Sequence, residues 1–164
     1  TPCISLADAF TCEKTAMLIA KFLHILGFTV WVGGMFFAHN ALRPTVAVTL
    51  EPPLRLTLLS GVFTRFFKWV WLSVALILGS GVYMMAQMGK PPLPVTAMFV
   101  IGVVMMLIFA HIFFAPFGRL KRAVAAQDWP AGGAAMATIR KLVGVNLLLG
   151  VLTILIGGLG PLFY

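Results

Sequence analysis

Four long apolar stretches, separated by shorter polar segments, dominate the pattern of the chain. They cover residues 16–42 or 21–42, 66–88, 95–117 and 142–162. A helix needs roughly 20 residues to cross the hydrocarbon core of a bilayer, and each stretch reaches that length. The connections suit antiparallel neighbours in a bundle. The pattern therefore predicts an all-α fold, an integral membrane antiparallel four-helix bundle that sits in the lipid bilayer.

The composition supports this prediction and sets apart an N-terminal extension. The chain is 61% hydrophobic and its mean hydropathy is +1.05, more apolar than a soluble domain of 164 residues requires. We expect one membrane domain at residues 16–164 and an extramembrane extension at residues 1–15. The extension holds both cysteines, Cys3 and Cys12. Their number and spacing match no zinc or c-type haem motif, and a disulfide between them stays open.

Basic residues are distributed unevenly between the expected connections. Nine of the twelve lysines and arginines fall in or beside the connections at residues 43–68 and 118–141, and three fall on the opposite side. Basic loops of membrane proteins face the cytoplasm, so both termini are expected outside. In a membrane protein the net charge of +8 indicates contact with anionic lipid headgroups rather than with nucleic acid.

Prolines set the expected ends of several helices. Pro44 is expected to stop the first helix, because proline lacks the backbone N–H and its ring clashes with the preceding turn. The run Glu51-Pro52-Pro53 marks a helix start, and the segment that follows it is expected to lie in the membrane interface as a short separate helix. Residues 118–141 are expected as the loop before the last helix.

Three histidines lie inside the apolar stretches, where ionisable groups are costly and usually functional. His24 and His39 lie within roughly 60° of each other around the first helix and about 22 Å apart along it, on the side that carries Trp31. Depth pairs His39 with His111, since both lie roughly 25 Å from the outer ends of their helices. Two imidazoles facing each other across a bundle can hold haem b. The alternatives are a His24–His111 pair, if the first helix starts earlier, and ordinary interhelical hydrogen bonds.

Further residues would complete a haem site. Arg43, Arg65 and Lys68 are placed to neutralise the propionates at the inner face, although anchoring to lipid headgroups explains them at least as well. A stripe of small and polar residues on one face of the last helix would leave space for a macrocycle, but close helix packing is the better explanation of such a stripe. The stripe consists of Asn146, Gly150, Thr153, Gly157 and Gly160.

A second arrangement concerns the outer end of the bundle, where methionines accumulate around His24. Met84 and Met88 share one face near the end of the second stretch, and Met98 lies near the start of the third. Thioether and imidazole ligands suit Cu(I), so these four residues form a candidate copper site. The simpler explanation is apolar packing, which is also expected for the Met105–Met106 pair.

The chain resembles the copper-resistance D (CopD) family over nearly its whole length from Met17. The matching motifs are Lys21-Phe-Leu-His24-Ile-Leu-Gly27, Trp31-Val-Gly33-Gly34-Met-Phe-Phe and, in short members of the family, the stretches around His39, His111 and Trp129. The His-to-Trp-Gly motif also resembles the HemJ-type membrane oxidases, which act on protoporphyrinogen and bind haem b. The resemblance implies a four-helix module in the bacterial inner membrane. It implies copper handling on the CopD side and haem on the HemJ side.

Three functions stay open from the sequence. The first is a haem b redox protein, a membrane oxidoreductase in its enzymatic form, that passes electrons to or from a quinone or a membrane redox partner. The second is copper binding or copper transport through His24 and the outer methionines. The third is an accessory subunit of a larger complex or a homo-oligomer. Hydrolysis and phosphoryl transfer are excluded, because the chain has no nucleophile–base pairing, Walker loop or paired carboxylates.

Overall fold

The computed structural model describes residues 6–159, which are almost entirely helical. The elements are α1 (Leu6–Phe37), η1 (Ala38–Leu42), α2 (Arg43–Thr49), α3 (Pro52–Gln87), α4 (Leu93–Phe114), α5 (Pro116–Ala125) and α6 (Trp129–Leu159). They combine into four long rods, each long and apolar enough to cross a membrane, at Thr11–Thr49, Pro52–Gln87, Leu93–Ala125 and Trp129–Leu159. The predicted all-α membrane bundle of four helices is confirmed.

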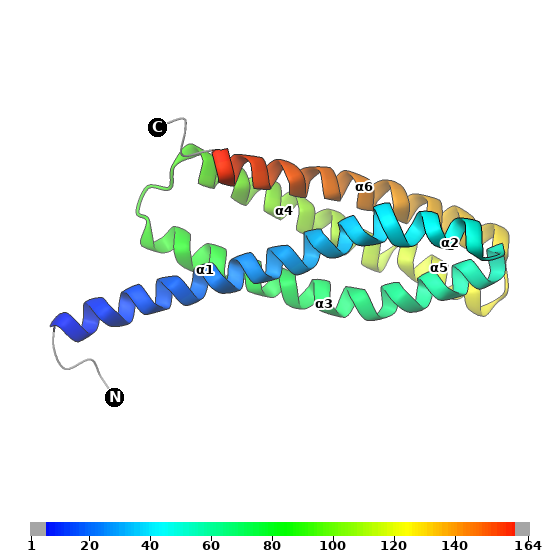
Figure 1. Ribbon diagram of the computed structural model, residues 1–164, viewed down its shortest axis with the longest axis horizontal. Coiled ribbons are helices and arrows are strands. Elements are labelled where there is room, and N and C mark those ends of the chain that lie inside the picture. The colour runs from blue at the N-terminus through cyan, green and yellow to red at the C-terminus, as the bar shows by residue number, and fades with distance from the viewer. Residues whose placement is uncertain (1–5, 160–164) are drawn as a thin grey trace.

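The four rods run up and down the bundle with short connections (Figure 1). At one end α1 begins, α3 turns into α4 and α6 ends; we call this the methionine end, because Met84, Met88 and Met98 lie there. The α2–α3 and α5–α6 connections lie at the opposite end, which we call the basic end after Arg43 and Arg140. α1 packs chiefly on α3, and α4 and α5 pack chiefly on α6. The two pairs of rods enclose the core between them.

The first rod does not stop at Pro44, and the prediction that it would is wrong. At Ala38–Leu42 the helix widens into the π-helical segment η1 and then continues as α2. The Arg43 N–H donates to the Ala38 carbonyl, five residues back. Pro44 falls in the first turn of α2, where the missing N–H is tolerated and the wider π turn accommodates the ring. The rod therefore extends about two turns past its expected end.

Basic residues extend helices at the basic end instead of forming long loops. α3 begins at Pro52 with Glu51 as its N-cap, as predicted, but it continues without a break, so the separate interfacial helix is wrong. α5 and the first turns of α6 replace most of the loop expected at residues 118–141. α5 buries Phe117 and Leu120 and exposes its charged side chains. Charge there marks the outer face of an amphipathic helix rather than a break in structure.

The N-terminal extension is described only in part. Residues 6–15 are helical and continuous with the rest of α1. Cys3 and Gly160, the last residue of the α6 stripe, lie outside the described residues, and the pairing of Cys3 with Cys12 stays open.

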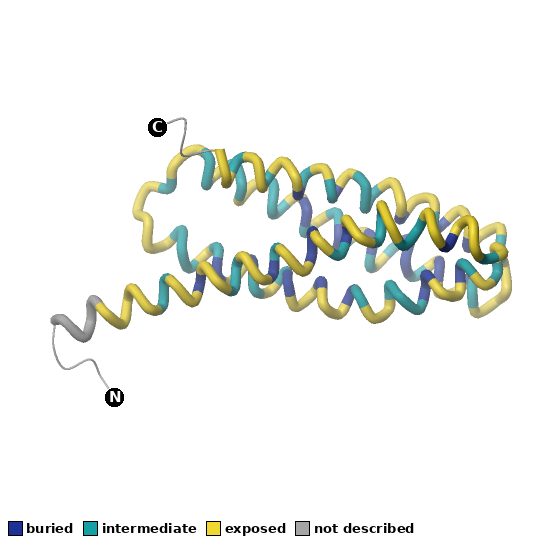
Figure 2. Tube along the Cα trace, in the orientation of Figure 1, coloured by how far each residue is buried: buried dark blue, intermediate teal, exposed yellow. Residues whose placement is uncertain are grey.

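An aromatic cluster forms the core in the middle of the bundle. The Phe67 ring is its centre, and five rings surround it at centroid distances of 4.9–6.3 Å, those of Phe63, Phe66, Phe109, Phe113 and Phe117. Large apolar side chains such as Leu148, which is 70% exposed, face outward as lipid contact requires. Buried positions gather in the middle and toward the basic end, while the methionine end has intermediate and exposed ones (Figure 2). The bundle is therefore packed less tightly at the methionine end.

Candidate functional site

A cavity of about 240 Å³ lies inside the methionine end, between α1, α3, α4 and α6. Its walls are mostly apolar, and among the described residues that line it His24 is the one ionisable group. Six of the nine methionines of the chain line this single cavity, which is more clustering than scattered packing would give. They are Met84, Met85, Met88, Met98, Met105 and Met106. The structure thus brings together the four residues of the candidate copper site and adds three methionines.

The imidazole of His24 is oriented by a hydrogen bond to α3. Its Nδ1 lies 3.0 Å from the Ser80 Oγ. The Ser80 hydroxyl donates its single hydrogen to the Leu76 carbonyl, so its oxygen accepts from the imidazole. In the tautomer that carries its proton on Nδ1, the imidazole donates this hydrogen bond and its Nε2 lone pair is available to a ligand. Histidines that bind metal ions usually donate their other N–H in this way.

Two glycines leave room for the side chains of His24 and Met98 at the cavity. A Cβ atom at Gly81 would lie 3.2 Å from the His24 Cε1, and one at Gly157 would lie 3.1 Å from the Met98 Sδ. Both distances are shorter than an ordinary van der Waals contact. A larger residue at either position would therefore displace an imidazole or a thioether from the cavity.

Trp31 separates the cavity from the middle of the bundle. It is 2% exposed, and its ring makes an edge contact with Phe109 at a centroid distance of 6.0 Å. On the side of Trp31 toward the basic end lies a second, much smaller cavity of about 20 Å³, which Trp31 lines together with Met35 and Asn146. Asn146 is fully buried, its Nδ2 lies 3.7 Å from the Met35 Sδ, and its Oδ1 has no hydrogen-bond partner among the described residues. Trp31 therefore lines both cavities, whereas Asn146 lines only the smaller one, toward the basic end.

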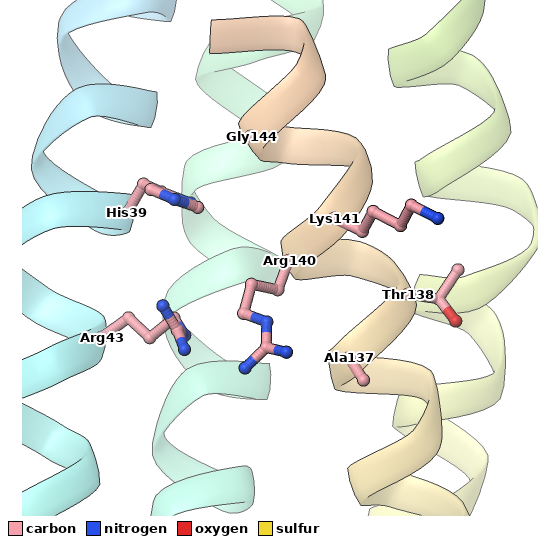
Figure 3. A pocket seen from close by; sticks show the side chains of 7 residues that line it. All are labelled: His39, Arg43, Ala137, Thr138, Arg140, Lys141 and Gly144. Atoms are coloured by element: carbon pink, nitrogen blue, oxygen red, sulfur yellow. The ribbon is translucent and has the colours of Figure 1, made fainter.

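The two histidines predicted as haem ligands do not meet in the described structure. His39 lies in η1 and faces α6, where a Cβ atom at Gly144 would be 3.3 Å from its Cε1. It lines an open pocket of about 580 Å³ (Figure 3). His111 is exposed on α4 and lies outside both that pocket and the cavity of His24. Neither the His39–His111 pair nor the alternative His24–His111 pair is formed.

The other residues expected around a haem are dispersed. Arg43 lines the pocket of His39, whereas Arg65 is exposed on α3 and lies outside it. On the α6 stripe, a Cβ atom at Gly150 would lie only 3.0 Å from the Val32 Cγ2. Gly150 therefore serves close helix packing, the simpler of the two explanations given for the stripe.

Met105 and Met106 pack in the apolar core, as expected, and they also contribute to the cavity wall. Both line the cavity, although Met105 is only 1% exposed. Met98 and Met105 are seven residues apart, which places them on one face of α4, and this spacing is the signal that could have identified Met105. Among residues 11–159, whose side chains the structure describes, no group of three or more His, Cys, Asp or Glu could hold a metal ion. Thioether sulfur is therefore the main metal donor that this structure offers.

Comparison with known proteins gives a family match over α4, α5, α6 and most of α3. The family described as Copper resistance protein D matches residues 60–159, a range that contains all six methionines of the cavity but not His24. No curated protein and no solved structure matches the chain. Because the family match covers more than half of its residues, this multi-pass membrane protein belongs to the copper resistance protein D (CopD) family.

Proposed function

We propose that the protein binds Cu(I) within the membrane, in the methionine-lined cavity, and contributes to copper resistance through this site. The observation that carries the proposal is the convergence of His24 and six methionines on one cavity. Membership of the CopD family supports the same metal, since the match includes every one of those methionines. Copper is the substrate of the site and not a permanent cofactor of the protein.

The chemistry of the donor atoms favours Cu(I) over harder cations. Thioether sulfur and neutral imidazole are soft ligands that suit Cu(I). Mg²⁺ and Ca²⁺ prefer oxygen ligands such as carboxylates, and no carboxylate is among the described residues that line this cavity. A monovalent ion also costs less to desolvate in an apolar cavity than a divalent one. The hydrogen bond to Ser80 adds to this fit, because it leaves the Nε2 of His24 free to bind.

We place the methionine end on the outer side of the membrane. Nine of the twelve lysines and arginines fall at residues 43–68 and 118–141, the two ranges that contain the connections of the basic end, and basic segments favour the cytoplasmic side. In this orientation the cavity receives Cu(I) from outside the cytoplasm. Trp31 then lies between the bound ion and the inner half of the bundle.

Haem b binding with electron transfer, the other function expected from the sequence, has weaker support. It would require a second axial ligand for His39, and His111 faces away from the bundle interior. The pocket of His39 is also open and holds a single imidazole among its lining residues. The experiment below therefore distinguishes haem binding from Cu(I) binding.

Titration of the purified full chain with Cu(I) tests the proposal. Under reducing conditions, with a coloured Cu(I) chelator as competitor, the wild-type protein is expected to bind a stoichiometric amount of Cu(I). A His24→Ala/Met84→Leu variant is expected to bind at least about tenfold more weakly, because it loses an imidazole and a thioether from one cavity. The matched control is His39→Ala/Met136→Leu, which removes the same two residue types from outside the cavity and should retain wild-type affinity.

Two results would contradict the copper function. If the cavity variant binds Cu(I) as tightly as its matched control, the methionines are packing residues. An absorption spectrum of wild-type protein expressed with added haem gives the second criterion. A Soret band that disappears in His39→Ala, together with absent Cu(I) binding, would replace the copper function with the haem function.

A further inference from the structure

A cleft with basic walls opens at the basic end, between the first rod and α6. Two adjoining pockets of about 580 Å³ and 240 Å³ share Arg43 and Arg140, and the smaller one adds Arg55. Figure 3 shows the side chains of Arg43 and Arg140 extending into the gap between the helices, below His39. Lys141 also lines the larger pocket, but its side chain extends to the other side of α6. The cleft is therefore built around three arginines, one each from α2, α3 and α6.

The cleft has no negative charge of its own. Among the described residues, those that line its two pockets include no aspartate and no glutamate. The guanidinium groups of Arg43 and Arg140 nevertheless approach the same gap from different helices, where like charges repel each other. Arg55 donates from Nη1 to the Ala47 carbonyl at 3.3 Å, which holds it beside the gap. An anion in the cleft would relieve this repulsion.

A second basic pocket at the same end shows that this lack of counter-charge is specific to the cleft. Arg119 and Arg122 line a pocket of about 490 Å³ together with Asp128. A carboxylate thus accompanies these arginines, which lie on α5 and face a different part of α6. The presence of a carboxylate therefore distinguishes the pocket of Arg119 and Arg122 from the cleft of Arg43, Arg55 and Arg140.

We propose that the cleft binds a phosphate group, either in the headgroup of an anionic lipid or as free phosphate. Guanidinium groups bind phosphate oxygens through planar, paired hydrogen bonds, and arginine is the preferred residue for this geometry. Three arginines from three rods can surround one phosphate and hold the rods together through it. The site lies at the opposite end from the methionine-lined cavity, so it is independent of the copper function.

Native mass spectrometry of the purified full chain tests this inference. The probes are dioleoyl phosphatidylglycerol, zwitterionic dioleoyl phosphatidylcholine and, in a separate arm, inorganic phosphate. The wild-type protein is expected to bind phosphatidylglycerol or phosphate about tenfold more tightly than an Arg43→Gln/Arg140→Gln variant, with little difference for phosphatidylcholine. The matched control is Arg119→Gln/Arg122→Gln, which removes the same charge from the same end and should bind like wild type.

The two arms identify the source of the phosphate. A loss confined to phosphatidylglycerol supports a lipid headgroup, and a loss of inorganic phosphate binding supports the free anion. Equal binding by the two glutamine variants overturns the proposal, and so does a wild-type protein that binds neither probe. An Arg43→Lys/Arg140→Lys variant, which keeps the charge and loses the paired geometry, is expected to bind several-fold more weakly than wild type. It gives the same test if the glutamine variant does not fold.

Discussion

The two ends of the bundle differ in the charge of the side chains that they gather. At the methionine end, uncharged thioethers and one imidazole surround an inner cavity, whereas at the basic end guanidinium groups without carboxylates line an open cleft. The first set of groups suits a soft cation and the second suits an anion. The aromatic cluster around Phe67 lies between them and keeps them apart.

This difference shows how packing sets what kind of site a membrane bundle can form. Thioether and imidazole donors that converge inside the bundle need interior space, and the methionine end provides it next to Gly81 and Gly157. Arginine side chains are long enough to meet outside the core, so they need no such space. The basic end can therefore bury Phe117 and Leu120 and still present an open cleft lined by arginines.

The largest effect is expected from removing the core that both ends share. Phe67→Ala should lower the free energy of unfolding by about 3 kcal/mol, because it leaves a void among five rings, and it should weaken Cu(I) and phosphate binding together. Reversible unfolding in mixed micelles measures the change. Phe114→Ala is the control: this ring is 72% exposed, and its loss should cost less than about 1 kcal/mol. Equal effects of the two substitutions would show that the cluster does not stabilise both ends.

A serine substitution should separate the two ends. Ser80→Ala removes the acceptor that orients the His24 imidazole, and Cu(I) affinity should fall roughly 10- to 100-fold while phosphate binding is unchanged. Competition titration with the Cu(I) chelator measures this. Ser73→Ala, at another buried serine of α3, should leave Cu(I) affinity near that of wild type. A similar loss in both variants would mean that Ser80 acts through packing alone.

A smaller effect at the methionine end is expected from one added methyl group. Gly81→Ala places a Cβ against the His24 ring and should weaken Cu(I) binding about fivefold, since the imidazole must shift. Gly79→Ala is the matched control, because a Cβ there meets nothing within 4 Å. The same titration applies. If Gly79→Ala weakens binding as much as Gly81→Ala does, helix propensity rather than the position of His24 explains the loss.

The smallest expected effect is a difference between the two ends in how strongly salt weakens ligand binding. Raising the ionic strength from about 0.1 M to about 1 M shortens the Debye length from about 10 Å to about 3 Å. Phosphate binding in the open cleft should weaken about threefold, whereas Cu(I) binding by uncharged ligands should change less than about twofold. Binding isotherms at the two salt concentrations provide the measurement. Cu(I) binding as salt-sensitive as phosphate binding would contradict the division between uncharged and charged sites.

Sequence reasoning predicted the spans well, because roughly 20 apolar residues indicate a bilayer crossing however the helices pack. It predicted helix ends poorly. The π-helical segment before Pro44 has no pattern in the sequence, and basic residues at 118–141 indicate a polar environment without indicating a loop. A helix can carry many charged residues where it extends beyond the apolar part of the membrane.

Depth was a better guide to the candidate copper site than to the histidine pair. His24 and the outer methionines needed only to share one end of the bundle to share a cavity. A pair of axial ligands must also point toward each other, and depth says nothing of direction around a helix. His111 is exposed on α4 and does not line the pocket of His39.

The π-helical segment of the first rod also changes how its faces must be compared. A π turn takes in one residue more than an α turn, so each position beyond Ala38–Leu42 is rotated by about 100° relative to an uninterrupted α-helix. Before the segment, Gly27 lies close against Ser73 of α3; at its end, Arg43 faces the gap beside α6. The segment thus acts as a one-residue insertion that rotates the later part of the rod relative to the earlier part. An alignment of relatives that lack this residue has to be read in two frames, one for each end of the bundle.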